Sequence, residues 1–196
     1  MRVVILGAGG FIGSALQTYF DNQKINIVCP DSTRVDLLDR KSIEQLQKIY
    51  RQGDRLIILA CLAPYRERGI EGHNKNLLIA NNIGDSISNI IAHITYLSSD
   101  AVYGSSNRVV SENLTPSPDT TYGQMHLSRE AIFSKFGDRL AIVRPTMVVG
   151  AADPHDAYGP NRFIRTALND KEVTLFGEGE ELRDYVALED LIPIIA

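Results

Sequence analysis

A glycine-rich turn lies between the first apolar segment of the chain and the first segment with helical periodicity. Gly7, Gly10 and Gly13 recur three residues apart directly after the run Val3–Leu6. A backbone without Cβ atoms can approach a diphosphate closely, and the helix that follows offers N–H groups and a favourable dipole. We expect Gly7 to make the turn, Gly10 to allow the close approach, and Gly13 to permit helix–strand contact. A flexible glycine loop that binds nothing remains the alternative, since the spacing alone is moderately specific.

Short β-branched runs alternate along the chain with longer segments of helical period. This alternation is typical of βαβ units, so we expect an α/β fold with a doubly wound parallel sheet. Asp39 is the expected N-cap of the second helix. The pattern predicts strands at Val3–Leu6, Ile25–Cys29, Leu56–Leu59, Ile94–Ser98 and Leu140–Val143, and helices at Phe11–Phe20, Lys41–Tyr50, Asn76–Ile91 and Tyr122–Phe136.

The chain has 196 residues, of which 44% are hydrophobic, enough for one globular domain with a sizeable core. Its formal charge of −4 argues against nucleic acid as a partner. No apolar stretch reaches the roughly 18 residues that a membrane span needs, so no membrane partner is expected. Cys29 and Cys61 lack the spacing of a metal site and are interpreted as reduced thiols. We therefore expect a cytoplasmic protein.

The texture of the sequence changes after Gly150. Turn-rich pieces surround short apolar segments, which predicts a smaller and less regular part at residues 151–196 after a first unit at residues 1–150. A new apolar helical pattern begins at Leu188 and stops at Ala196, which suggests a truncated chain or an abridged second domain. His155, Asp153 and Asp156 fall within one loop without a distant ligand, so no metal site is expected.

Two hydroxyl groups indicate chemistry. Ser99 follows the predicted fourth strand, and Tyr122 opens a predicted helix. Together such groups can hold and protonate a substrate oxygen, but a tyrosine of this kind ionises easily only beside a cation. His126 occupies the position one helical turn further along, where that cation would lie. Arg129 lies a second turn away, about 10 Å from Tyr122 along the helix, which makes direct substitution doubtful.

Acidic residues follow the predicted second strand. Asp31 is placed to accept hydrogen bonds from an adenosine ribose, which favours NAD over NADP, although Arg34 could weaken that preference. An aspartate here is also an ordinary turn residue. Asp36 and Leu37 either hold an adenine edge or form a plain surface turn.

The order of these segments resembles that of the extended short-chain dehydrogenase/reductases, in particular the NAD-dependent nucleotide-sugar epimerase/dehydratase group. The resemblance covers essentially the whole chain and is specific only in combination. It rests on the glycine turn, Asp31, Leu59–Ala63, the segment Ser98–Gly104, Tyr122-Gly123, Arg144-Pro145-Thr146 and Arg183-Asp184-Tyr185.

The resemblance implies a Rossmann domain that binds NAD and a smaller part that closes over a nucleotide-diphospho-sugar. Tyr122 would be the catalytic base and Ser99 would bond the reacting sugar hydroxyl. Substrate contacts would come from Ser99, Asp100, Asn161 and Arg183, although Arg183 could instead form a surface ion pair. Cofactor contacts would come from Gly7, Gly10, Phe11, Ile12, Gly13, Asp31, Asp36, Leu37, Ala60, Ala63, Asn76 (or Asn74), Ser98, Tyr122, His126, Pro145 and Thr146.

The sequence departs from this family at His126, where the family has lysine. A histidine can still bond a ribose hydroxyl, but its reference pKa of about 6.5 makes its electrostatic help weaker and dependent on pH. Either His126 is a working substitute in an enzyme, or turnover is lost and the chain is an NAD-binding regulatory or scaffolding protein. We favour an enzyme of surface polysaccharide synthesis, and an epimerase over a dehydratase because Ala101 follows Asp100. A homodimer through the two long helices is a further expectation from the resemblance.

Overall fold

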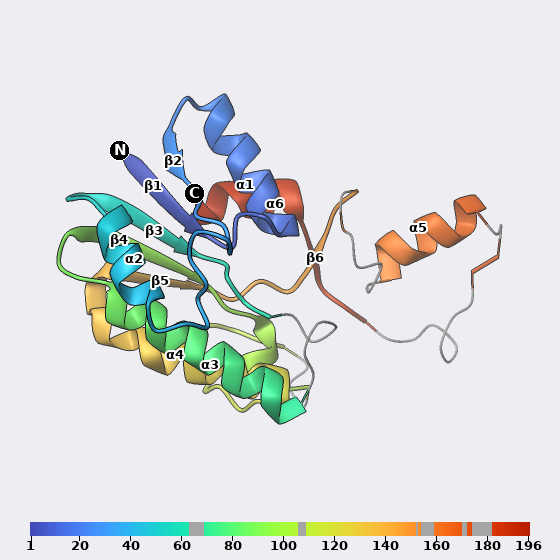
Figure 1. Ribbon diagram of the computed structural model, residues 1–196. Helices are drawn as coiled ribbons and strands as arrows, with labels where there is room; N and C mark the ends of the chain where they lie inside the picture. The colour runs from blue at the N-terminus through green and yellow to red at the C-terminus, as the bar shows by residue number, and fades with distance from the viewer. Residues whose placement is uncertain (63–68, 106–108, 152, 154–158, 170–171, 174–181) are drawn as a thin grey trace.

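A parallel β-sheet with helices on both faces forms the centre of the molecule (Figure 1). The computed structural model describes residues 1–62, 69–105, 109–151, 153, 159–169, 172–173 and 182–196. Five strands are arranged in the order β2-β1-β3-β4-β5, and every neighbouring pair is parallel. Their bounds are Arg2–Leu6 (β1), Asn26–Val28 (β2), Asp54–Ile58 (β3), Ile91–Leu97 (β4) and Leu140–Val143 (β5). The predicted doubly wound α/β fold is confirmed.

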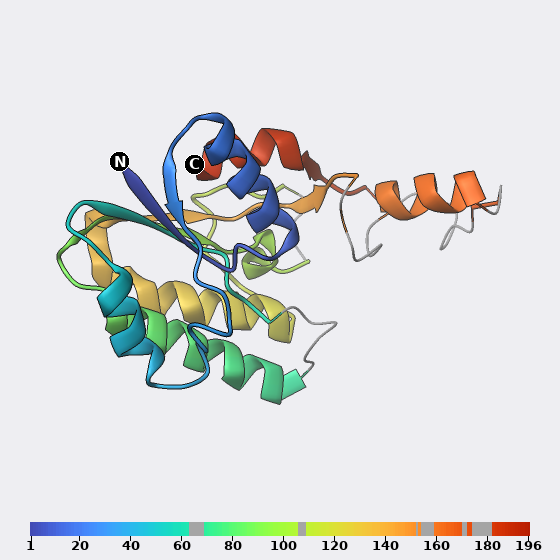
Figure 2. The same cartoon turned by 45° about the horizontal axis from the view of Figure 1, so that its top comes forward.

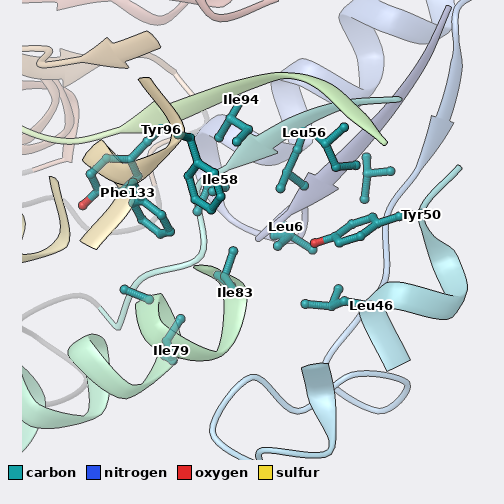
Figure 3. Close-up of a cluster of buried hydrophobic side chains, with 14 of the residues drawn as sticks. Leu6, Leu46, Tyr50, Leu56, Ile58, Ile79, Ile83, Ile94, Tyr96 and Phe133 are labelled. Atoms are coloured by element: carbon teal, nitrogen blue, oxygen red, sulfur yellow. The ribbon is translucent and has the colours of Figure 1, made fainter. Parts of the chain in front are cut away.

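The sheet carries two separate apolar layers, because its strands present β-branched residues to both faces. On one face, α2 (Ser42–Ile49), α3 (Gly69–Ser86) and α4 (Thr121–Phe133) cover the sheet. On the other, α1 (Phe11–Asn22) and α6 (Leu188–Ile195) pack together (Figure 2). In the first layer, Leu56, Ile58, Ile94 and Tyr96 of the sheet lie opposite Ile79 and Ile83 of α3, with Leu46, Tyr50 and Phe133 around them (Figure 3).

Several predicted helix bounds and one predicted cap differ from the structure. The segment predicted as a helix at Asn76–Ile91 is α3, which is already helical at Gly69 and ends at Ser86. The later isoleucines belong to the approach to β4, because Asn89 and Ile90 form a turn and Ile91 opens the strand. Asp39 is not the N-cap of α2. Its carboxylate accepts from the Lys41 N–H at 3.0 Å in a separate turn, and Lys41 itself precedes the helix. The helix predicted to run to Phe136 ends at Phe133 and continues as the 3-10 helix Ser134–Arg139.

Elements after residue 146 were not predicted individually, except for the last helix. β6 (Met147–Val149) pairs in parallel with β7 (Tyr185–Ala187). α5 (Gly159–Asn169) extends away from the sheet in both views (Figures 1 and 2). The apolar pattern from Leu188 forms α6, which packs against the same cluster as Val3, Ile5 and Leu16. Among the helices that the structure describes, none has the length and apolar character of a membrane span.

Candidate active site

The glycine turn closes β1 tightly against the end of β3. Gly7 has a φ of +93°, and a Cβ there would lie 2.6 Å from the Ala60 backbone nitrogen. A Cβ on Gly13 would lie 2.5 Å from the Gly7 carbonyl oxygen, so the expected close helix–turn contact at Gly13 is present. Side chains are therefore excluded at both ends of the turn by the protein itself.

The middle of the turn is open. Gly10 is exposed, and a Cβ there would meet only the Gly7 oxygen, at 3.5 Å. Gly10 also precedes α1 without a side-chain cap, so the first N–H groups of that helix, from Phe11 onward, face no capping group. Phe11 and Ile12 are half-buried at this helix start. An open glycine beside an uncapped helix N-terminus matches the needs of a diphosphate.

The acidic residues after β2 form turns at the surface. One oxygen of Asp31 accepts from the Thr33 hydroxyl at 2.6 Å and from the Thr33 and Arg34 N–H groups at 2.9 and 3.0 Å. These bonds, led by the Thr33 hydroxyl, lower the pKa of Asp31. Asp36 likewise accepts from the Leu38 N–H, while the half-buried Leu37 accepts at its carbonyl from Asn82. The turn roles left open by the sequence are thus present, and the ribose and adenine roles stay predictions.

The segment after β3 is held by a buried asparagine in the interior of α3. Asn76 accepts from the Leu62 N–H at 2.8 Å and donates to the Leu62 carbonyl at 2.9 Å. Its carboxamide therefore shapes the backbone beside the glycine turn, where Ala60 lies. Ala63, the other small residue predicted near the cofactor, lies outside the described residues.

Ser99 begins a short 3-10 helix, η1 (Asp100–Tyr103), directly after β4. Its hydroxyl accepts from the Ala101 N–H at 3.2 Å and donates to Asp100 at 3.1 Å. This cap fixes the hydroxyl at the carboxyl edge of the sheet, which is where ligands bind in open parallel sheets.

Tyr122 lies in the first turn of α4, which Thr120 caps by accepting from the Gly123 N–H. The start of α4 packs tightly on η1: a Cβ on Gly123 would collide with the Ala101 carbonyl. Gly123 belongs to the Tyr122-Gly123 pair that carries part of the family resemblance, and this close packing requires a glycine there. It lets the helix bring the half-buried Tyr122 next to the element that Ser99 opens.

His126 is almost fully buried, with 3% of its surface exposed. Its Nδ1 lies 2.9 Å from the Tyr96 hydroxyl, and its ring meets that of Tyr122 edge-on, with centroids 4.6 Å apart. Burial, followed by the nearby charge of Arg129, lowers the pKa of His126 to about 3. The expectation of pH-dependent electrostatic help near neutrality is therefore wrong. This imidazole is neutral throughout the physiological range.

Arg129 is fully buried beside the candidate site, a position that the sequence did not indicate. It is 0% exposed and lies on the buried side of α4 with Met125 and Phe133. Its guanidinium donates to the Ala60 carbonyl at 2.7 Å and to the Asn76 carboxamide at 3.2 Å. An arginine spaced four residues from apolar neighbours on both sides was the available signal.

A second arginine, the half-buried Arg144, forms a network with Glu130 of α4. Glu130 accepts from Arg144 at 2.9 and 2.7 Å and from Ser98 at 2.5 Å, while Arg144 also donates to the Tyr103 hydroxyl at 2.6 Å. The carboxylate of Glu130 is the main cause of the raised pKa of Arg144. Ser98, predicted to contact cofactor, is used here to join β4 to α4.

Several predicted substrate and cofactor residues line a cavity of about 1240 Å³. They are Asp100, Thr146 and Arg183. The Thr146 hydroxyl donates to the Asp184 carbonyl at 2.7 Å, and the Pro145 carbonyl accepts from the Asp100 N–H at 3.1 Å. The C-terminal segment thus closes one side of a space that η1 borders on the other.

Asn161 is not among the described residues that line this cavity; it lies in α5 and donates to Asp153 at 2.9 Å. The described part of the chain has no cluster of metal-ligating side chains, and His155 and Asp156 lie outside that part. The structure therefore gathers Asp100, Thr146 and Arg183 around one space, and neither Asn161 nor the catalytic candidates Ser99 and Tyr122 are among the described residues that line it.

Comparisons with known proteins agree with this geometry. MoeE5, solved in complex with UDP-glucose and NAD, superposes with a TM-score of 0.80 at 25% identity, over 100% of this chain and 70% of that one. The uncharacterized UDP-glucose epimerase YtcB of Bacillus subtilis is 26% identical over 98% of this chain and 70% of its own length. The beta subunit of methionine adenosyltransferase 2 from Rattus norvegicus is 26% identical over 78% of this chain. The chain spans 48% of that protein.

The sequence matches one family along nearly its entire length, from residue 3 to residue 196. The matched range includes the glycine turn, Ser99 and Tyr122. Members of this family depend on NAD, and the open turn at Gly10 fits that cofactor. The chain belongs to the NAD dependent epimerase/dehydratase family.

Proposed function

We propose that this protein is an NAD-dependent epimerase that acts on a nucleotide-diphospho-sugar. The observation that carries the proposal is the packing of α4 on η1, which places Tyr122 beside the helix that Ser99 caps. YtcB is named as a UDP-glucose epimerase and MoeE5 was solved with UDP-glucose and NAD, which supports a uridine-linked hexose as the substrate.

Tyr122 would remove the proton from a sugar hydroxyl, and the Ser99 hydroxyl would orient that oxygen. NAD, when bound, accepts and returns the hydride of the adjacent carbon. The cavity beside Asp100 would hold the sugar while it turns to present its other face. Arg183, at the rim contributed by the C-terminal segment, would bind the diphosphate through its permanent charge.

The epimerase outcome is preferred over dehydration. A dehydratase needs an acid–base pair of carboxylates after the serine, and here Asp100 is followed by Ala101. The Asp100 carboxylate is moreover engaged by the Ser99 hydroxyl at 3.1 Å. The same residues could also reduce the transient keto-sugar without inverting the carbon. Identification of the product therefore distinguishes an epimerase from a reductase.

A second candidate is an NAD-binding regulatory protein without turnover. The neutral, buried His126 favours it, because a neutral imidazole gives Tyr122 no positive charge. The rat relative is also named as a subunit of another enzyme. A protein that binds NAD but converts no nucleotide-sugar into product would have this function.

We further infer a cytoplasmic location, supported by the free thiols of Cys29 and Cys61, and a role in surface polysaccharide synthesis. A homodimer through α3 and α4 is part of the same proposal. Sedimentation of the purified chain tests the dimer independently of activity.

The decisive experiment compares Tyr122→Phe with wild type, using UDP-glucose and NAD and separating the C4 epimers by chromatography. Loss of a general base predicts a fall in turnover of about 10²–10⁴-fold with NAD affinity nearly unchanged. Tyr19→Phe, a half-buried tyrosine of α1, is the matched control and should retain activity. Equal turnover in Tyr122→Phe and wild type would remove Tyr122 from the mechanism.

A further inference from the structure

Arg129 is a buried cation whose bonded partners are neutral. In the part of the chain that the structure describes, its guanidinium donates to the Ala60 carbonyl and the Asn76 carboxamide and also interacts with the Tyr96 hydroxyl, which are all neutral partners, and its Nε has no hydrogen-bond partner. Burying a charge without a counter-charge costs several kcal/mol in real proteins. The neighbouring Glu130 does not offset it, because that carboxylate is bonded to Arg144 and Ser98.

The charge of Arg129 acts on the aromatic groups beside the proposed base. Its guanidinium carbon lies 5.4 Å from the centre of the Tyr96 ring, and the Tyr96 hydroxyl lies 2.9 Å from Nδ1 of His126. His126 in turn contacts the ring of Tyr122. A continuous line of contacts therefore leads from Arg129 to Tyr122 along the buried side of α4.

We propose that Arg129 and His126 form one unit, in which Arg129 supplies the positive charge of this wall and the residue at position 126 must stay neutral. Arg129 is then a positioning residue that acts on Tyr122 through Tyr96 and His126. The catalytic part of this proposal rests on the proposed function. The pairing of a cation at position 129 with a neutral group at position 126 is independent of that function.

The groups around His126 explain why a second cation is excluded. Tyr96 of β4 and Tyr122 and Arg129 of α4 face it, and Cys61 lies near Arg129 and Tyr96. Burial raises the pKa of both Tyr96 and Cys61, so neither offers an anion at neutral pH. A lysine at 126 would meet the Arg129 charge in a low-dielectric region, where the carboxylate that acts on Tyr96, that of Glu130, is already bonded to Arg144 and Ser98.

The test is a double-mutant cycle read as thermal stability, without cofactor or substrate. We expect His126→Lys to lower Tm by about 5–8 °C, since a chain of this size loses 2–4 °C per kcal/mol. The double variant His126→Lys with Arg129→Met should return to within about 2 °C of Arg129→Met alone. His126→Met, of similar length but uncharged, should be tolerated with Arg129 present. The proposal is overturned if His126→Met lowers Tm as much as His126→Lys does. It is also overturned if the Tm of the double variant is no higher than that of His126→Lys alone.

A second measurement follows the imidazole by NMR. The chain has four histidines, so the His126 ring can be assigned by comparison with His126→Asn. In wild type its signals should not titrate between pH 5 and 9, and Arg129→Met should shift its titration upward, while Arg129→Lys should keep it low. An unchanged titration in Arg129→Met would overturn the link. Because neither measurement uses a sugar, an inactive but coupled protein contradicts only the proposed function.

Discussion

The fully buried Arg129 and the half-buried Arg144, which both contact residues near α4, illustrate two ways of placing a charge inside a protein. Arg144 has a carboxylate partner, and four hydrogen bonds join it, Glu130, Ser98 and Tyr103. Arg129 is more deeply buried, yet among the described residues it bonds only neutral oxygens. The first arrangement ties β4, η1, α4 and the end of β5 together. The second joins α4 to Ala60 and to Asn76 of α3, and under our proposal its charge acts on the site.

Removing the carboxylate of the paired arginine should produce the largest effect. Glu130→Gln leaves the Arg144 guanidinium, whose side chain is 23% exposed, without its counter-charge. Breaking such a pair typically costs 3–5 kcal/mol, and we expect about 3 kcal/mol here in urea unfolding. Glu71→Gln, which removes the exposed pair of Glu71 with Lys75, is the control and should change stability by less than about 0.5 kcal/mol. Similar losses in the free energy of unfolding for Glu130→Gln and Glu71→Gln would show that the network around Glu130 does not stabilise the fold more than a surface ion pair does.

The lowered pKa of His126, to which burial and the charge of Arg129 contribute, should be visible in the pH dependence of stability. The pKa of His126 is about 3 in the folded protein and about 6.5 unfolded, so the unfolded chain binds more protons between these values. The contribution is present above pH 6.5 and is lost as pH falls toward 3. Between pH 7 and pH 5, wild type should lose about 2 kcal/mol more than His126→Asn. Parallel curves for the two proteins would show that His126 titrates normally.

The contrast between the arginines also marks how far the sequence could lead. The strand–glycine–helix start and the alternating apolar runs predicted the sheet, because periodicity and glycine chemistry are local. The Ser99 and Tyr122 positions were likewise recoverable from sequence. The partners of Arg129 and Arg144 were not, because Ala60, Asn76 and Glu130 meet them only through packing of distant segments. The lowered pKa of His126 could not be predicted for the same reason. Burial is its main cause, and burial depends on segments that are distant in the sequence.

The smallest effect on stability should come from replacing Arg129, the arginine without a carboxylate partner among the described residues, by methionine. Arg129→Met gives up two hydrogen bonds, but Asn76 keeps both its bonds to Leu62, and the cost of an uncompensated charge disappears. We expect the free energy of unfolding to change by less than about 1 kcal/mol, whereas Arg144→Met, which leaves Glu130 buried and unpaired, should cost about 3 kcal/mol. Equal losses in the two variants would make Arg129 a structural clamp like Arg144. A small loss at Arg129 together with reduced turnover would mean that its charge is retained for Tyr122 and not for the fold.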